Sequence, residues 1–91
     1  MESKVYYAVF QSEFQEDLRY WVHVDRQVAE QIMTMVEAIV RDPTCSLGQP
    51  QLLNHLSPAV WARIITQEHR LVYLLGEQRI DFLQARYHQR R

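Results

Sequence analysis

The chain has 91 residues, 47% of them hydrophobic, which predicts one small domain with an apolar core over residues 1–91 and excludes a disordered chain. The single cysteine, Cys45, excludes a disulfide within the chain, and the lack of a signal peptide or a long apolar run predicts a soluble, cytoplasmic protein. The formal net charge is −1, but the residues from Pro43 onward carry six bases and three acids, so any basic patch for phosphate is confined to that part.

The first elements predicted are a strand and a helix. Val5–Phe10 is rich in aromatic and β-branched residues, which favours a strand. A helix is expected from about Glu13 to Val24, with Ser12 as its N-cap and Gln15 completing a capping-box pattern. The apolar stripe predicted from helical spacing comprises Phe14, Leu18, Trp21 and Val22. The acids that suit the helix dipole in the first turns are Glu13, Glu16 and Asp17.

A second helix gives the clearest periodic signal in the chain. Asp25 can cap its N-terminus, and Asp42-Pro43 ends it because the residue before proline avoids helical geometry. Its apolar positions are Val28, Ile32, Met35, Val36, Ile39 and Val40. Two helices with almost no linker should form an antiparallel hairpin.

The stretch Thr44–Pro58 predicts a loop, because it contains a glycine, two prolines, an asparagine and two serines. Its leucines at positions 52, 53 and 56 are the expected apolar anchors.

A β-hairpin follows the loop. Val60–Thr66 and Leu71–Leu75 are rich in β-branched, aromatic and apolar residues and are separated by a polar turn. Gly76–Gln78 predicts a second turn, and Arg79–Arg86 predicts the last strand. The element order β-α-α-β-β-β predicts an α+β domain, with an antiparallel sheet covered on one face by the helical hairpin.

Two arginines, Arg63 and Arg70, lie in the otherwise apolar hairpin strands. Each side chain either reaches a solvated face or belongs to an anion site, because a guanidinium matches phosphate oxygens two at a time. A two-residue turn would place both on one face of the sheet, and a three-residue turn would separate them. The sequence leaves both registers open.

A set of short motifs is spread over nearly the whole chain, and the most specific of them is Glu68-His69-Arg70-Leu71-Val72-Tyr73. The other segments are Asp17-Leu18-Arg19-Tyr20-Trp21, Leu47-Gly48-Gln49-Pro50, Trp61-Ala62-Arg63, Ile65-Thr66-Gln67 and Arg86-Tyr87-His88. Together these motifs resemble the YoeB/Txe family of the RelE toxin superfamily.

This resemblance implies a RelE-like toxin fold and a toxin of a type II toxin–antitoxin pair. Members of the family cleave mRNA on the ribosome without a metal, so the implied partners are the ribosome, mRNA and a cognate antitoxin. No cofactor is implied, and a homodimer is compatible with the family. The implied chemistry is attack of a ribose 2′-hydroxyl on the neighbouring phosphate, which needs a base, a cation and an acid.

The catalytic positions of the family are only partly kept. Arg70 and His88 match the phosphate-binding arginine and the C-terminal histidine, and Arg63 matches a further arginine. Gln51 replaces a catalytic glutamate, Ile64 replaces a second arginine, and Gln89 replaces a tyrosine. The expected RNA-binding residues at the basic C-terminus are Arg86, Arg90 and Arg91.

These substitutions leave more than one function open. A toxin with weakened RNA cleavage is the first hypothesis, because a glutamine amide cannot take up a proton at neutral pH. A catalytically inactive toxin homologue that binds an antitoxin, or acts as a co-repressor, is the alternative. A metal site on His55, His69 and His88 is disfavoured, because the three residues do not have ligand spacing.

Overall fold

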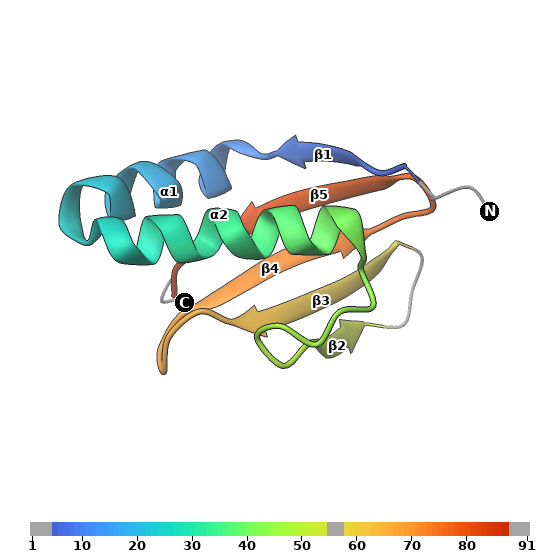
Figure 1. Cartoon of the computed structure of the whole chain (residues 1–91). Coiled ribbons are helices and arrows are strands. Elements are labelled where there is room, and N and C mark those ends of the chain that lie inside the picture. Colours follow the sequence, from blue (N-terminus) through green and yellow to red (C-terminus); the bar gives the residue numbers. More distant parts are fainter. Residues whose placement is uncertain (1–4, 55–57, 88–91) are drawn as a thin grey trace.

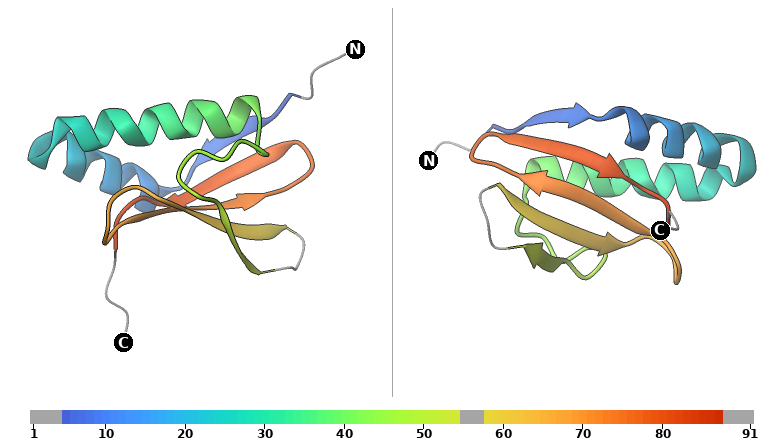
Figure 2. Two further views of the ribbon diagram at one scale, coloured as in Figure 1. Left: turned by 60° about the horizontal axis from the view of Figure 1, so that its bottom comes forward. Right: turned by 180° about the vertical axis from the view of Figure 1, so that it is seen from behind.

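The computed structural model describes residues 5–54 and 58–87 and confirms the α+β class. The elements run in the order β1 (Tyr7–Phe10), α1 (Ser12–Val24), α2 (Arg26–Arg41), β2 (Gln51–Asn54), β3 (Ala59–Ile64), β4 (Arg70–Leu75) and β5 (Arg79–Gln84) (Figure 1). The two helices form an antiparallel hairpin that covers one face of the sheet, as predicted, and the opposite face is open (Figure 2). No helix within the described ranges has the length and apolar character needed to span a membrane.

The five strands form one sheet in the order β1-β5-β4-β3-β2. The expectation of a purely antiparallel sheet is wrong, because β1 pairs with β5 in parallel and only the other pairs are antiparallel. The helical hairpin returns the chain to the far side of the sheet, and the last strand then inserts between β1 and β4. Strand β5 therefore lies inside the sheet, beside the first strand of the chain.

Strand β2 lies within the segment predicted as a loop. It pairs only with β3, at the edge of the sheet, and its register shifts between Leu52 and Asn54. Leu53 is 53% exposed and does not act as an apolar anchor, because side chains alternate and this one points to solvent. Leu52 is half-buried, and Leu56 lies outside the described residues.

The N-cap predicted for α2 is confirmed, and the N-cap predicted for α1 is wrong. Asp25 caps α2 as predicted, because its carboxylate accepts a hydrogen bond from the Gln27 N–H at 3.2 Å. The prediction that Ser12 caps α1 is wrong, since Gln11 occupies the N-cap position without a side-chain bond. The Gln15 side chain instead donates to the Phe10 carbonyl at 2.8 Å, which ties α1 to the end of β1.

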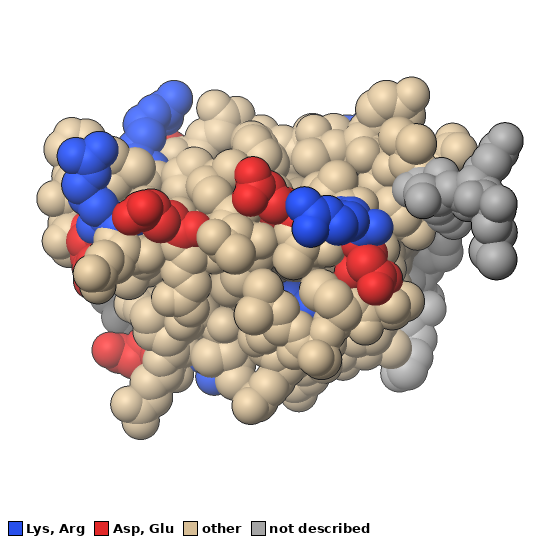
Figure 3. All heavy atoms as spheres, viewed as in Figure 1, with Lys and Arg blue, Asp and Glu red and all other residues tan. Residues whose placement is uncertain are grey.

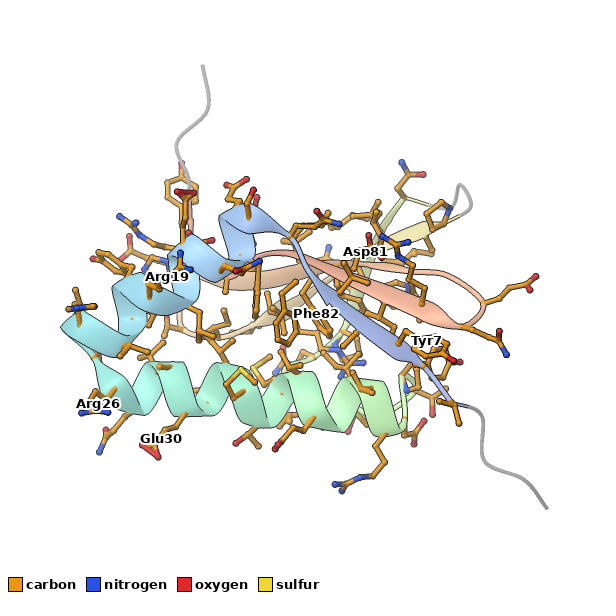
Figure 4. The ribbon with its side chains drawn as sticks, turned by 90° about the horizontal axis from the view of Figure 1, so that it is seen from above. Tyr7, Arg19, Arg26, Glu30, Asp81 and Phe82 are labelled. Atoms are coloured by element: carbon orange, nitrogen blue, oxygen red, sulfur yellow. The ribbon has the colours of Figure 1, made fainter. Side chains whose placement is uncertain are left out.

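The core lies between the helices and the covered face of the sheet. Alternation along β5 places Phe82 toward the helices and Asp81 away from them (Figure 4). The predicted stripe of α1 is correct for Phe14 and Trp21 but wrong for Val22, which is 42% exposed. The buried apolar side chains of α2 are Val28, Ala29, Ile32, Met35, Val36 and Ile39. This layer packs the helices against one face of the sheet and leaves the opposite face uncovered by them.

Candidate functional site

The register of the hairpin separates the two arginines. Ile64 pairs with Arg70, and Arg63 pairs with Leu71, so five residues, 65–69, connect the two strands. Because neighbouring side chains alternate between faces, Arg63 points toward the helices and Arg70 toward the open face. Of the two registers that the sequence left open, the structure adopts the one that places the arginines on opposite faces.

Arg63 is fully buried, with 0% of its surface exposed. Its Nε donates to the Tyr73 hydroxyl at 2.8 Å, and Nη1 donates to the Cys45 and Leu47 carbonyls, each at 2.8 Å. Nη2 donates to the Pro43 carbonyl at 2.9 Å. Burial raises the pKa of the Tyr73 hydroxyl, and the bond from Arg63 offsets this only in part. The guanidinium therefore holds the loop between α2 and β2, and this placement contradicts a direct contact between Arg63 and a phosphate.

Three of the positions singled out from the sequence lie on the open face. Gln51 pairs with Ala62, which lies two residues before Ile64 on the same face of β3, and Ile64 pairs with Arg70. Gln51 is exposed, whereas Ile64 and Arg70 are half-buried. The fold thus brings together the glutamine, the isoleucine and the retained arginine of the family pattern.

The loop that leads to Gln51 is held by close contacts at Gly48. Gly48 has a φ of +76° and its carbonyl accepts the Ile64 N–H at 2.7 Å. A Cβ at this position would lie 2.8 Å from the terminal carbon of Met35 and 3.1 Å from the Cβ of Arg63. Only glycine fits this close approach with this backbone conformation, so the loop enters β2 along one path.

Arg70 keeps part of its guanidinium available. Its Nη1 donates to the Thr66, Gln67 and His69 carbonyls at 3.0, 3.1 and 3.2 Å, which closes the turn between β3 and β4. Among the residues that the structure describes, Nε and Nη2 have no hydrogen-bond partner. A half-buried guanidinium held by one nitrogen can present the other two to an anion.

The C-terminal segment lies against the same turn. The Tyr87 N–H donates to Nδ1 of His69 at 2.9 Å, and the Arg86 guanidinium stacks on the Tyr20 ring with Cζ 3.6 Å from the ring centroid. Sequence reasoning missed His69 as a contact of this segment. The predicted site residues His88, Gln89, Arg90 and Arg91 follow directly but lie outside the described residues, so their roles stay predictions.

The surface of the helical hairpin lacks the excess of positive charge that binding a polyanion requires. Acidic side chains lie between and beside the basic ones along the helical hairpin in the view of Figure 3, so the described residues form no continuous basic patch on this face. Among the described residues, no group of three or more histidine, cysteine or acidic side chains is placed to hold a metal ion. His55 and His88 of the disfavoured metal hypothesis lie outside those residues.

Comparison with known proteins gives a consistent result. The family model described as "YoeB-like toxin of bacterial type II toxin-antitoxin system" matches residues 10–89. Toxin RelK of Mycobacterium tuberculosis is 40% identical over 73 residues, which cover 80% of this chain and 86% of the relative. The YoeB dimer from Staphylococcus aureus superposes with a TM-score of 0.78 at 26% identity, covering 96% of this chain and all of that one. The heterotetrameric YoeB–YefM toxin–antitoxin complex from the same organism gives 0.77 at 26%, covering 92% and 98%.

Proposed function

This chain belongs to the YoeB-like toxins of bacterial type II toxin–antitoxin systems, and on that premise we propose that it binds mRNA on the open face of its sheet and cleaves it slowly. The observation that carries the proposal is the meeting of Gln51, Ile64 and Arg70 on that face. The arginine offers to a phosphate the two nitrogens that have no hydrogen-bond partner among the described residues, and the other two positions lack the charge that the family pattern has there.

The proposed reaction is attack of a ribose 2′-oxygen on the adjacent phosphorus, followed by breakage of the bond from phosphorus to the 5′-oxygen. Arg70 neutralises charge that develops on the phosphoryl oxygens. His88 donates a proton to the departing 5′-oxygen, a role that suits a side chain titrating near neutral pH. The 2′-hydroxyl proton passes to water, because the Gln51 amide cannot accept it.

The two substitutions set the expected size of the loss. A positioned general base contributes typically about 10²–10⁴ in rate, and one charge-stabilising donor about 10²–10³. Losses at residues that act together need not multiply. We therefore expect cleavage to persist at a small fraction of the rate that a glutamate and a second arginine would support.

The proposed partner is a cognate antitoxin. The Staphylococcus aureus complex pairs a similar toxin with the antitoxin YefM, and a dimer of that toxin is also known. We extend both assemblies to this chain, whose basic C-terminal part would attract an acidic antitoxin segment. A ribosome-bound mRNA substrate places its site of action in the cytoplasm.

The alternative function is a toxin homologue that binds its antitoxin, as a decoy or a co-repressor, without cleaving RNA. The observation that favours it is the loss of charge at both Gln51 and Ile64, since these positions lie beside Arg70 on the open face. Antitoxin binding would then be the whole activity of the protein.

A purified translation system with a defined mRNA distinguishes the two functions. The wild type should cleave the message slowly, and Gln51→Glu with Ile64→Arg should raise the rate by about 100-fold or more. Arg70→Met should abolish cleavage in both backgrounds. The matched controls are Gln78→Glu, which adds a carboxylate at the exposed turn before β5, and Ile64→Leu, which keeps the position apolar. Absence of cleavage in every variant, with antitoxin binding intact, would select the alternative.

A further inference from the structure

Helix α1 holds Ala85 by both of its backbone polar groups. An Asp17 carboxylate oxygen accepts the Ala85 N–H at 2.9 Å, and the Trp21 indole N–H donates to the Ala85 carbonyl at 2.9 Å. Asp17 and Trp21 are four residues apart, so they lie on the same side of the helix. All three residues are buried, with Asp17 2% and Trp21 7% exposed. A segment 64 residues further along the chain is therefore fixed to the first helix.

His69 provides a second anchor, which holds Tyr87, two residues after Ala85. Its Nδ1 accepts the Tyr87 N–H at 2.9 Å, and its ring lies edge-on to Trp21 with centroids 4.8 Å apart and planes at 83°. A backbone N–H can only donate, so Nδ1 must be unprotonated and the ring proton is on Nε2. Trp21 thus touches both anchors, and the three side chains form one connected cluster.

The burial of Asp17 indicates that the first anchor is specific. Burying a carboxylate away from water is unfavourable unless the carboxylate is hydrogen-bonded. A bond to a backbone amide fixes the position of the main chain, and any residue except proline at position 85 supplies that amide. Between the anchors, Arg86 stacks on Tyr20 at 3.6 Å. Residues 85, 86 and 87 each contact a fixed element immediately before His88.

We propose that Asp17 and His69 are positioning residues: they hold the backbone of residues 85–87, and the use of the following residue, His88, in cleavage depends on this anchoring. His69 and Arg70 are adjacent in the sequence and belong to the same turn. The arginine proposed to bind phosphate and the anchor of the C-terminal segment therefore belong to one hydrogen-bonded turn. This inference rests on the proposed function for the use of His88 in cleavage, but the anchoring is independent of it.

A matched pair of substitutions isolates the second anchor. Asparagine and leucine have nearly the same shape, and only the asparagine Oδ1 can replace Nδ1 as the acceptor of the Tyr87 N–H. His69→Leu should raise the amide exchange rate of Tyr87 about tenfold or more, as expected on losing one hydrogen bond at a chain end. It should also change the His88 ring resonances, whereas His69→Asn should leave both near wild type.

Cleavage kinetics are measured in the Gln51→Glu, Ile64→Arg double variant, in which faster cleavage is expected. There His69→Leu should lower kcat about 10- to 100-fold with little change in KM, because a displaced acid slows the chemical step more than substrate binding. His69→Asn should restore kcat. Trp21→Phe, which removes the donor to Ala85 and keeps an aromatic ring, tests the first anchor if His69→Leu does not fold.

Two results would overturn the inference: unchanged Tyr87 exchange and His88 resonances in His69→Leu, or an equal loss of kcat in the asparagine and leucine variants. If no variant cleaves RNA, the proposed function fails, and the exchange and resonance measurements still decide whether His69 positions the segment.

Discussion

Arg63→Met should lower the stability of the fold markedly, because methionine fills the space of the side chain and donates no hydrogen bond. The Pro43, Cys45 and Leu47 carbonyls and the Tyr73 hydroxyl would lose their donor. Four bonds from a charged group, at the low end of about 1.5 kcal/mol each, total about 6 kcal/mol. Relief of the buried charge offsets about 3 kcal/mol of this, which leaves a net loss of about 3 kcal/mol.

Urea denaturation measures this loss directly, and thermal unfolding gives a second readout. A domain of this size has a total stability of about 5–15 kcal/mol, and a loss of about 3 kcal/mol should lower Tm by roughly 12–24 °C. Arg70→Met is the matched control, because its guanidinium bonds three carbonyls of a turn while half-buried. That variant should lose about 1 kcal/mol or less and should lose RNA cleavage.

The reasoning would be refuted by an Arg63→Met protein within about 1 kcal/mol of the wild type, since the four bonds would then not hold the loop. A loss no larger than that of Arg70→Met would have the same meaning. The experiment would thus separate the two arginines into one that stabilises the fold and one that is proposed to contact substrate.

Three further predictions concern the frame around the site. Gly48→Ala should cost about 1–3 kcal/mol in urea denaturation, because φ is +76° and a Cβ meets three neighbouring atoms; a neutral result would contradict the described loop path. Asp25→Ala should cost about 1 kcal/mol, with less helix by circular dichroism, because the cap on Gln27 is lost. The Arg79 hydrogen bond holds the pKa of Asp81 below its usual value. The stability that ionised Asp81 contributes to the fold is therefore present above about pH 4 and is lost as the pH falls through the lowered pKa. The stability difference between wild type and Asp81→Asn should therefore shrink on acidification, and a difference that grows would exclude this ion pair.

Local signals predicted the helical part of the fold well. The periodicity of α2, its Asp25 cap and its end at Asp42-Pro43 are all encoded within a few residues of each position. Strand β2 escaped prediction because Gln51–Asn54 becomes a strand only through pairing with β3. Its leucine, glutamine and asparagine residues have little strand preference of their own.

The candidate site was predictable in its residue types and not in its geometry. The faces of Arg63 and Arg70 depend on the length of the connection between β3 and β4, which the sequence left open. Asp17 was interpreted as a carboxylate that suits the helix dipole, whereas the fold buries it against the Ala85 amide. A backbone amide 68 residues away leaves no signal in the sequence, because every residue type except proline supplies it.

The interior position of β5 has a consequence for how the protein folds during its synthesis. Among the described strands, β1 pairs only with β5, and β4 pairs with β5 on one side and with β3 on the other. The last of these strands to be synthesised therefore joins β1 to the rest of the sheet. A nascent chain lacking residues 79–84 would have nothing between these two parts, and such distant pairings form late. A chain of this topology completes its sheet only after residues 79–84 have been synthesised and have entered between β1 and β4.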